Sequence, residues 1–388
     1  MKKVLLVMLV VSMVLVGVFS GCTPAADTAA TDDTAAEDTA TDDTAAEDTA
    51  AADDAADAPK EKIYLGMAIR SLTNPYYIQL QEGAEMFADW LIANGQDAEV
   101  VMLVSDGSDE KQLSDINAFI AAHGENCILY VDPNNAPNAI PIAEACEDNG
   151  VYWETTWSTA EDIKIKDFEY YVFHQTLDDR GSGYAISKAM FEQFDTPGEG
   201  KVLAIQGMLA NSAAINRFKG LEDALAEYPG VELLDDQAGD WDPQKAYTIA
   251  ETWLSKYDDI AGIWVANDSM ALAVVELLEA KGLIGDVKVV GVDGIPDAVT
   301  AIQEGKMTAT VYSDPYKQGG GSLAYLYQIW MGNIAVSSLT DEQRCFLTEG
   351  VLVTADTVDA FANSTPEFDY GDPQTMIYKL WDIPAIQD

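Results

Sequence analysis

The chain has 388 residues, with 66 acidic and 21 basic side chains and a formal net charge of -45. This excess of negative charge argues strongly against nucleic acid or an anionic membrane surface as a partner. The chain has two histidines, His123 and His174. Neither is flanked by cysteines or carboxylates at the spacing of a metal-binding motif. We therefore predict no metal site and no cofactor.

Residues 1–21 have the pattern of an export signal. A basic start is followed by an uncharged apolar stretch from Val4 to Phe19, and Ser20 and Gly21 close it before Cys22. At about 16 residues the stretch is shorter than the roughly 20 that a spanning helix needs, so we predict a cleaved signal peptide. The cysteine after Gly21 resembles the lipobox of bacterial lipoproteins, which implies cleavage before Cys22 and lipidation of it. An ordinary signal peptide with an incidental cysteine is the alternative.

Residues 22–60 form an acidic, low-complexity segment. From Thr23 to Pro59 it contains only Thr, Pro, Ala, Asp and Glu, and the ten residues 31–40 are repeated at 41–50. Such a composition has little apolar surface to bury and repels itself, so we predict a disordered tether that holds a folded domain away from the membrane. An acidic tail that binds a partner is the competing interpretation.

From residue 61 onward, apolar runs of strand length alternate with helical patterns. This alternation predicts an α/β protein built of βαβ units and parallel sheets, and the length predicts two lobes. Helices are expected over 212–228, 243–257 and 269–281, among others. The expected strands are 63–69, 98–104, 127–131, 151–155, 170–174, 201–207, 231–238, 260–266, 287–293 and 308–313.

Polar and aromatic residues gather where the predicted strands end. The segment Arg70 to Tyr77 follows the first strand, and Asp132 ends the third. Asn211, Asp240-Trp241-Asp242, Asn267-Asp268 and Asp293 occupy the same place after later strands. Open α/β sheets bind their ligands at this edge, whereas any one Asp or Asn before a helix is more often only a cap. The recurrence at several strand ends favours a binding site.

From Ile63 to about Thr354 the chain resembles the sugar-binding proteins of bacterial ABC transporters, in the ribose-binding and galactose-binding group of type I periplasmic binding proteins. The resemblance implies two similar lobes, each a parallel sheet flanked by helices, joined by a three-crossover hinge. Five segments in the family's order carry it: Asn74-Pro75-Tyr76-Tyr77, Asn211 to Arg217, Asp240-Trp241-Asp242, Ala266 to Leu272, and Val290 to Gly294.

The resemblance also implies roles for individual side chains. Residues that would hydrogen-bond ligand hydroxyls are Asn74, Arg217, Asn267 and Asp293, and those that would pack on a sugar ring are Tyr76, Tyr77 and Trp241. Carboxylate, guanidinium and amide groups suit vicinal hydroxyls, and aromatic faces cover the C–H faces of a sugar.

Some positions depart from the family pattern. Ribose binders carry Asp-Arg after their fourth strand, where this chain reads Glu154-Thr155-Thr156-Trp157. Ser313 stands at the family's crossover Gln, and Arg70 replaces a usual Ser. The candidate ligand contacts among these positions are Arg70, Thr156, Trp157 and Ser313. The departures favour an aldohexose, polyol or sugar acid over ribose, with Arg70 as the reason to consider an acid. A surface or hinge ion pair is an equally good interpretation of Arg70, and Trp157 is equally typical of a core residue.

The resemblance implies a first lobe of residues 61–176 and 314–343 and a second of 177–313 and 344–388, with crossovers near Thr176, Ser313 and Arg344. The residues after Thr354 extend past the family's usual end. Cys127 and Cys146 are close enough in the predicted topology for a disulfide, although buried free thiols are equally consistent with the sequence, and Cys345 has no expected partner.

We expect a monomeric receptor that delivers its ligand to an ABC permease. A sensor of the same fold that signals to a membrane receptor or kinase is the alternative. A transcriptional regulator would need a basic helix-turn-helix at its start, which the signal peptide and the acidic segment exclude. We predict no catalytic site, since the chain has no Gly-x-Ser-x-Gly motif and Gly181-Ser182-Gly183 lacks the context of a dinucleotide loop.

Overall fold

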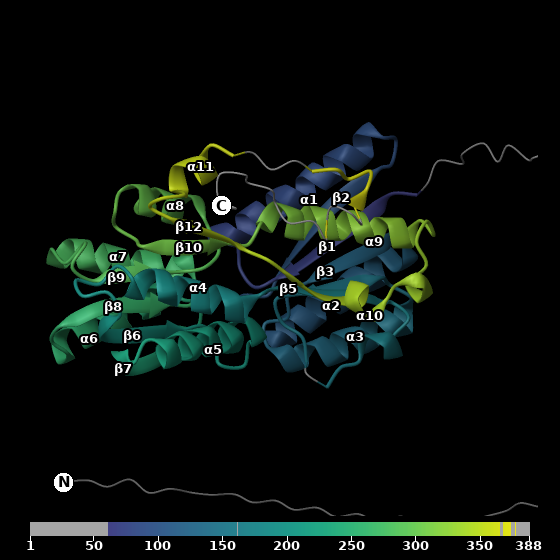
Figure 1. The fold of residues 1–388 in the computed structure, drawn as a ribbon. Coiled ribbons are helices and arrows are strands. Elements are labelled where there is room, and N and C mark those ends of the chain that lie inside the picture. The colour runs from purple at the N-terminus through teal and green to yellow at the C-terminus, as the bar shows by residue number, and fades with distance from the viewer. Residues whose placement is uncertain (1–60, 161, 365–367, 374–376, 378–388) are drawn as a thin grey trace, which may run out of the picture. The chain divides into compact units, whose positions relative to one another are not determined.

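The computed structural model describes residues 61–160, 162–364, 368–373 and 377. Within this range the strands form two six-stranded sheets, with the orders β11-β5-β4-β3-β1-β2 and β12-β10-β9-β8-β6-β7. Neighbouring strands are parallel except β10 and β12. Each sheet is the centre of one lobe (Figure 1). The predicted α/β fold with two lobes is confirmed. The predicted signal peptide, Cys22 and tether lie outside the described residues.

The first lobe surrounds the first sheet. Helices α1 and α9 lie on one face of the sheet and α2 and α3 on the other (Figure 1). Its elements are β1 (Ile63–Ile69), α1 (Pro75–Ala93), β2 (Ala98–Val104), α2 (Asp109–His123), β3 (Cys127–Val131), α3 (Ala139–Asn149), β4 (Trp153–Thr156), β5 (Tyr171–Leu177), a π-helical turn (Lys317–Gly321), α9 (Ser322–Trp330), α10 (Asp341–Arg344) and β11 (Cys345–Thr348).

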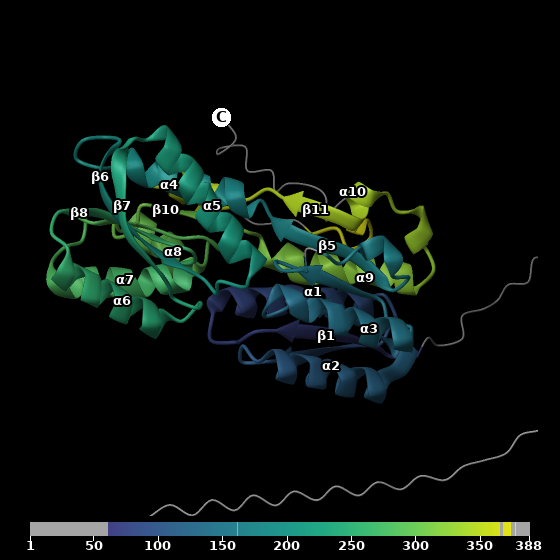
Figure 2. The ribbon, with the colours of Figure 1, turned by 90° about the horizontal axis from the view of Figure 1, so that it is seen from below.

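The second lobe repeats this arrangement around the second sheet. Figure 2 shows α4 and α5 on one side of that sheet and α6 and α7 on the other. Its elements are α4 (Asp179–Phe191), β6 (Glu199–Gln206), α5 (Ser212–Glu227), β7 (Gly230–Ala238), α6 (Pro243–Lys256), β8 (Ile260–Val265), α7 (Asp268–Lys281), β9 (Lys288–Val290), α8 (Pro296–Gln303), β10 (Ala309–Tyr312), β12 (Val351–Thr354) and α11 (Val358–Ala362).

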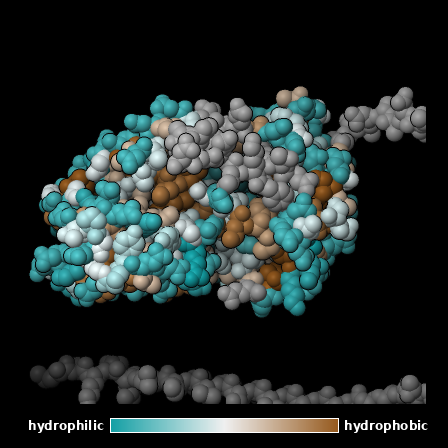
Figure 3. Space-filling view, viewed as in Figure 1, coloured by the Kyte–Doolittle hydropathy of each residue, from teal (hydrophilic) through white to brown (hydrophobic). Residues whose placement is uncertain are grey.

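The central strands are buried because helices cover both faces of each sheet. The five residues of β3, Cys-Ile-Leu-Tyr-Val, are all buried, and β1 is buried at all but one position. Such continuous apolar runs are typical of parallel strands. Because these strands run parallel, the turns that lead from strand to helix lie at the same edge of each sheet. In the view of Figure 3 the outer surface of both lobes is mainly hydrophilic, which agrees with the acidic composition.

The chain passes between the lobes three times. The first two passages follow β5 and β10, near Thr176 and Ser313. The third comes later than the predicted position near Arg344, because β11 extends the first sheet and β12 the second. Arg344 is held in the first lobe, where its guanidinium donates to the backbone carbonyls of Val172, Ile165, Phe168 and Tyr171.

Gly350 lies at this third passage. A Cβ there would come within 2.3 Å of Val311 and 3.0 Å of Leu177, which flank the other two passages. The backbone nitrogen of Asp178 also donates to the carbonyl of Thr348 at 2.8 Å. The three connections therefore run close together, as a hinge requires.

The segment after β12 contacts both lobes. Helix α11 packs on α8 of the second lobe, with the ring of Phe361 5.0 Å from that of Tyr312. Farther on, the ring of Tyr370 lies 5.3 Å from that of Phe87 on α1 of the first lobe, and Tyr370 is buried. The predicted assignment of residues 344–388 to the second lobe is therefore wrong for Arg344, for β11 and for the segment around Tyr370. Trp381 lies outside the described residues.

The cysteines in the described range are free thiols. Cys127 and Cys146 are buried and Cys345 is exposed. Burial raises the pKa of the Cys127 thiol to about 12, which makes it a poor nucleophile. Among the described residues, no helix has both the length and the apolar character needed to span a membrane.

Candidate ligand-binding site

A cavity of about 680 Å³ lies where the carboxyl ends of the two sheets face each other. Nine of the residues predicted to contact a ligand line it. Those from the first lobe are Arg70, Asn74, Tyr76, Tyr77 and Trp157, and those from the second are Arg217, Trp241, Asn267 and Asp293. Further lining residues are Ser71, Thr73, Asp106, Gly107, Asp132, Met208, Asn211, Ala213, Asp240, Asp242 and Pro243.

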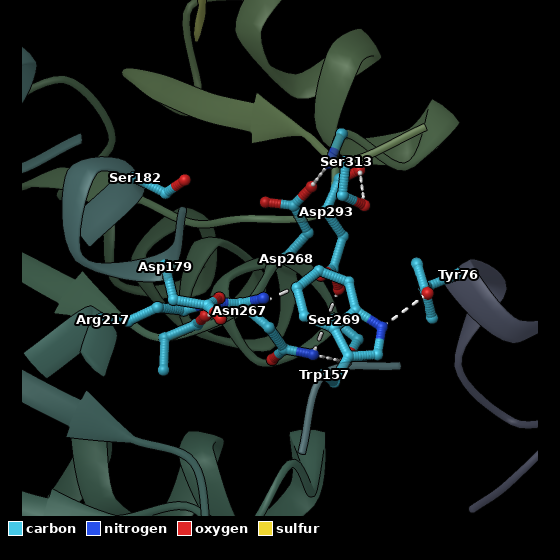
Figure 4. Close-up of polar contacts among 12 residues, drawn as sticks. Tyr76, Trp157, Asp179, Ser182, Arg217, Asn267, Asp268, Ser269, Asp293 and Ser313 are labelled. Carbon is cyan, nitrogen blue, oxygen red and sulfur yellow. Dashed lines mark hydrogen bonds and ion pairs between the residues drawn. The ribbon is translucent and has the colours of Figure 1, made fainter. Parts of the chain in front are cut away.

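Arg217 is the centre of the second lobe's wall. Its side chain is 3% exposed, and its Nε lies 2.8 Å from Oδ1 of Asp179, which is equally buried. Its Nη1 donates to the carbonyl oxygen of Ala266 at 2.8 Å and lies 3.7 Å from Oδ1 of Asp293. The guanidinium is thus fixed by two buried carboxylates, as Figure 4 shows.

Two tryptophans cover this guanidinium. Its carbon lies 4.9 Å from the ring centre of Trp157 in the first lobe and 5.7 Å from that of Trp241 in the second. Both distances allow a cation–π interaction. Trp241 fits here because residue 207 is glycine, since a Cβ there would come within 2.1 Å of the indole. The cavity thus has aromatic faces from both lobes around one cation.

Asp293 is held beside Asn267 and Asp268. The amide nitrogen of Asn267 lies 3.4 Å from Oδ2 of Asp293 and 3.0 Å from the hydroxyl of Ser269. Burial raises the pKa of Asp293 well above its usual range, while the neighbouring Arg217 opposes that rise. Asp268 has a structural role, because its Oδ2 accepts from the backbone nitrogens of Gly294 and Ile295 and so shapes the turn that carries Asp293.

Tyr76 connects three segments of the first lobe's wall. Its hydroxyl donates to Oε1 of Gln318 at 2.6 Å. The same hydroxyl accepts from the indole nitrogen of Trp157 at 2.6 Å, as Figure 4 shows. The rings of Tyr76 and Trp157 meet edge to face, with centres 5.5 Å apart. Because the protein occupies this hydroxyl, Tyr76 offers a ligand mainly its ring.

Tyr77 and Arg70 surround Asp132. The Tyr77 hydroxyl donates to Oδ2 of Asp132 at 2.6 Å. Arg70 donates to the carbonyl of Asn134 at 2.9 Å and contacts the sulfur of Met208 in the second lobe. Burial raises the pKa of Asp132 to about 6, and the Arg70 charge opposes the rise. Arg70 is therefore a cleft residue that reaches the opposite lobe, not a surface ion pair.

Several cavity residues have an uncommon backbone conformation. In the described range seven non-glycine residues have positive φ, and five of them line the cavity: Asp106, Trp157, Asp240, Trp241 and Asp293. The values are 68° for Trp157, 62° for Trp241 and 131° for Asp293. Such conformations cost of order 1–3 kcal/mol each and gather at functional sites. The concentration of strain in the cavity supports a binding role for these side chains.

The strand-end amides combine capping with cavity lining. Asn74, Asn211 and Asn267 use their side-chain oxygen to accept from the first turn of α1, α5 and α7, and Asp242 does the same for α6. All four also line the cavity. Helix capping and cavity lining are therefore compatible roles for the three Asn residues. The side-chain oxygen caps the helix, and the residue still lies at the cavity wall.

Two predicted residues do not line the cavity. Thr156 is fully buried, and its hydroxyl donates to the Glu154 carboxylate and accepts from the amide of Gln175. Ser313 is buried in the second crossover, where its hydroxyl donates to the carbonyl oxygen of Asp293 at 3.4 Å. Thr156 is positioned to support β4 and Ser313 to support the Asp293 turn.

Two important residues were not among the predicted contacts. Asp132 directly follows β3, which is next to β1 in the sheet, and this place at a strand exit is the signal that identifies it. Asp179 carries no such signal, because an acid in the first turn of α4 has an ordinary explanation in the helix dipole.

Contacts cross the cavity mouth between the lobes. The backbone nitrogen of Ala136 donates to the carbonyl of Ala210 at 3.2 Å, and the hydroxyls of Ser158 and Ser212 are 3.3 Å apart. With the Arg70 contact to Met208, these interactions bring the first lobe against the loop that follows β6. The arrangement is that of lobes closed over a cavity.

The sequence matches a known protein family. The family model of the periplasmic binding protein domain matches residues 65–334, which is more than half of the chain. The chain belongs to this family. The family predicted from the five sequence segments is confirmed, and membership implies an exported, extracytoplasmic protein.

Similar proteins include sugar receptors. The D-allose-binding periplasmic protein of Escherichia coli K12 is 27% identical over 261 residues, which is 66% of this chain and 81% of that protein. The ribose import binding protein RbsB of Salmonella typhimurium is 28% identical over 259 residues, covering 66% of this chain and 80% of the relative.

Solved structures agree with this assignment. A twin-arginine translocation pathway signal protein from Burkholderia phytofirmans is 36% identical with a TM-score of 0.73, and the match covers 77% of this chain and 91% of that one. A periplasmic solute-binding protein of an ABC transporter from Actinobacillus succinogenes 130z, solved with bound D-allose, is 25% identical with a TM-score of 0.67, covering 77% and 99%.

Proposed function

We propose that this protein captures a sugar or sugar-like ligand, such as a hexose or polyol, in the cavity between its lobes and delivers it to an ABC permease by hinge closure. The observation that carries the proposal is the pairing of Arg217 and Asp293 with aromatic rings from both lobes around one interlobe cavity. Pockets of 300–1,000 Å³ with a few fixed polar groups are typical of small-molecule sites.

The side chains divide into two kinds of contact. Asp293 and Arg217 supply charge-assisted hydrogen bonds to ligand hydroxyls, which are stronger than neutral ones, and Asn74 and Asn267 supply amide groups. Trp157, Trp241 and the tyrosine rings pack on the C–H faces of a sugar ring. Because both lobes contribute to each kind, a ligand gains its full set of contacts only when the lobes are closed.

The proposal includes the protein's setting. The protein is a monomeric binding protein without catalytic activity that docks on the permease subunits. Cys22 carries a lipid anchor in the outer face of the cell membrane, and residues 22–60 give the folded part reach above it. The anchor and the tether rest on the sequence of residues 1–60 and its resemblance to lipoprotein signals, and the permease partner on the family.

A thermal-shift screen tests the proposal. We expect at least one member of a panel of pentoses, hexoses, polyols and sugar acids to raise the melting temperature. At a ligand concentration 100-fold above Kd, binding adds about 2.7 kcal/mol to the free energy of unfolding. A melting temperature that no member of the panel changes, even at millimolar concentration, contradicts sugar capture.

A further inference from the structure

Asp132 has one carboxylate oxygen without a partner. The residue is 2% exposed and lines the cavity. Its Oδ2 accepts from Tyr77, whereas its Oδ1 is buried and has no hydrogen-bond partner within the described part of the chain. An unsatisfied buried acceptor is costly, of order 1–3 kcal/mol, so a donor from a bound ligand would be stabilised there.

The guanidinium of Arg70 is held by contacts within the protein. It donates to the Asn134 carbonyl and contacts Met208, and its charge lies close enough to Asp132 to lower the pKa of that carboxyl. Two of the Arg70 donors are therefore already used within the protein, and the nearby Asp132 carboxylate weakens the attraction that Arg70 can offer a ligand carboxylate.

The charges around the cavity disfavour an anion as well. Its lining residues include two cations, Arg70 and Arg217, against five carboxylates: Asp106, Asp132, Asp240, Asp242 and Asp293. Arg217 is in addition paired with Asp179 behind the wall. Asp106, Asp240 and Asp242 are exposed, and Asp240 is paired with Lys245, so the buried negative charge is that of Asp132 and Asp293. A ligand carboxylate placed beside these two buried carboxyl groups would face like charge at low dielectric.

We propose that the site takes uncharged polyhydroxylated ligands and rejects their carboxylated analogues, and that Asp132 sets this preference. The inference rests on the proposed capture of a sugar-like ligand and narrows its class. A hydroxyl of the ligand donates to Oδ1 of Asp132. Both carboxylate oxygens then accept a hydrogen bond, since Oδ2 already accepts from Tyr77. A carboxylate of the ligand at the same place has no proton to donate and is repelled.

Matched pairs of ligands test the preference by calorimetric titration. Suitable pairs are D-glucose with D-glucuronate, D-galactose with D-galacturonate, D-ribose with D-ribonate, and D-glucitol with D-gluconate. We expect the neutral member of any pair that binds to have a Kd at least tenfold lower than that of the acid. An acid that binds as tightly as its neutral partner overturns the inference and leaves sugar-like capture standing. If neither member of any pair binds, the proposed function is contradicted and the inference falls with it.

Substitutions then test the assignment to Asp132. In Asp132→Asn we expect the ratio of acid Kd to neutral Kd to fall at least tenfold, whereas Asp132→Glu, which keeps the charge, should retain most of the preference. Glu110→Gln removes one exposed charge from α2 of the same lobe and should leave the ratio unchanged. An unchanged ratio in a folded Asp132→Asn protein overturns the role of Asp132. If that variant does not fold, the wild-type ratio still decides whether acids are rejected.

Discussion

Arg217→Ala is expected to lower the free energy of unfolding by about 3–5 kcal/mol, because it leaves two buried carboxylates without their shared cation. Asp179 and Asp293 are both almost fully buried, and burial raises the pKa of each while Arg217 opposes the rise. Removal of the guanidinium also removes the stacking partner of Trp157 and Trp241. Urea denaturation followed by circular dichroism measures the loss.

Arg180→Ala is the matched control. Arg180 is 60% exposed and pairs with Asp223 on the surface of the same lobe. Surface pairs contribute about 0–1 kcal/mol, so this variant should unfold close to the wild type. Equal stability of the Arg217→Ala and Arg180→Ala proteins would show that the buried cluster does not hold the second lobe's wall together.

Asp293→Asn is expected to raise the Kd for the ligand identified in the thermal-shift screen by roughly tenfold to hundredfold. The change keeps the shape of the side chain but loses the charge that strengthens hydrogen bonds to ligand hydroxyls, worth about 1.5–3 kcal/mol. Arg217 keeps Asp179 as a partner, so the variant should remain folded. Calorimetric titration measures the affinity and circular dichroism checks the fold.

A second aspartate of the same lobe serves as the control for this loss of charge. Asp297 is an exposed residue in the first turn of α8, four positions farther along the chain. Asp297→Asn should bind the ligand with unchanged affinity. If Asp293→Asn also binds as tightly as the wild type, Asp293 is not a ligand contact.

The strands of the two sheets could be predicted because most of them are continuous apolar runs, which a short stretch of sequence reveals. Each of the ten expected strands overlaps an observed one, from β1 to β10. Strands β11 and β12 were missed because each has only four residues and is largely half-exposed or exposed, so neither has the continuous apolar run of a central parallel strand. β11 pairs with β5 and β12 pairs with β10, and both partners lie far away in the sequence. A local sequence pattern does not reveal such long-range pairing.

The candidate site also has residues that a local pattern reveals and residues that depend on long-range contacts. Residues at strand ends, such as Asn74 and Asp293, were predictable because parallel strands bring their carboxyl ends together. Asp179 was not, since it reaches Arg217 from a helix 38 positions earlier in the chain. Thr156 is the converse case, because it ends β4 beside Trp157 but its side chain is fully buried and does not line the cavity.

Closure of the two lobes about the three-crossover hinge is expected to enclose the ligand. Solution X-ray scattering of the protein with and without a saturating concentration of the ligand found in the screen measures this closure. Because both lobes contribute walls to the cavity, we expect the bound protein to have a smaller radius of gyration. Asp293→Asn at the same ligand concentration should remain closer to the ligand-free profile. Identical profiles for the free and the saturated wild-type protein would contradict closure.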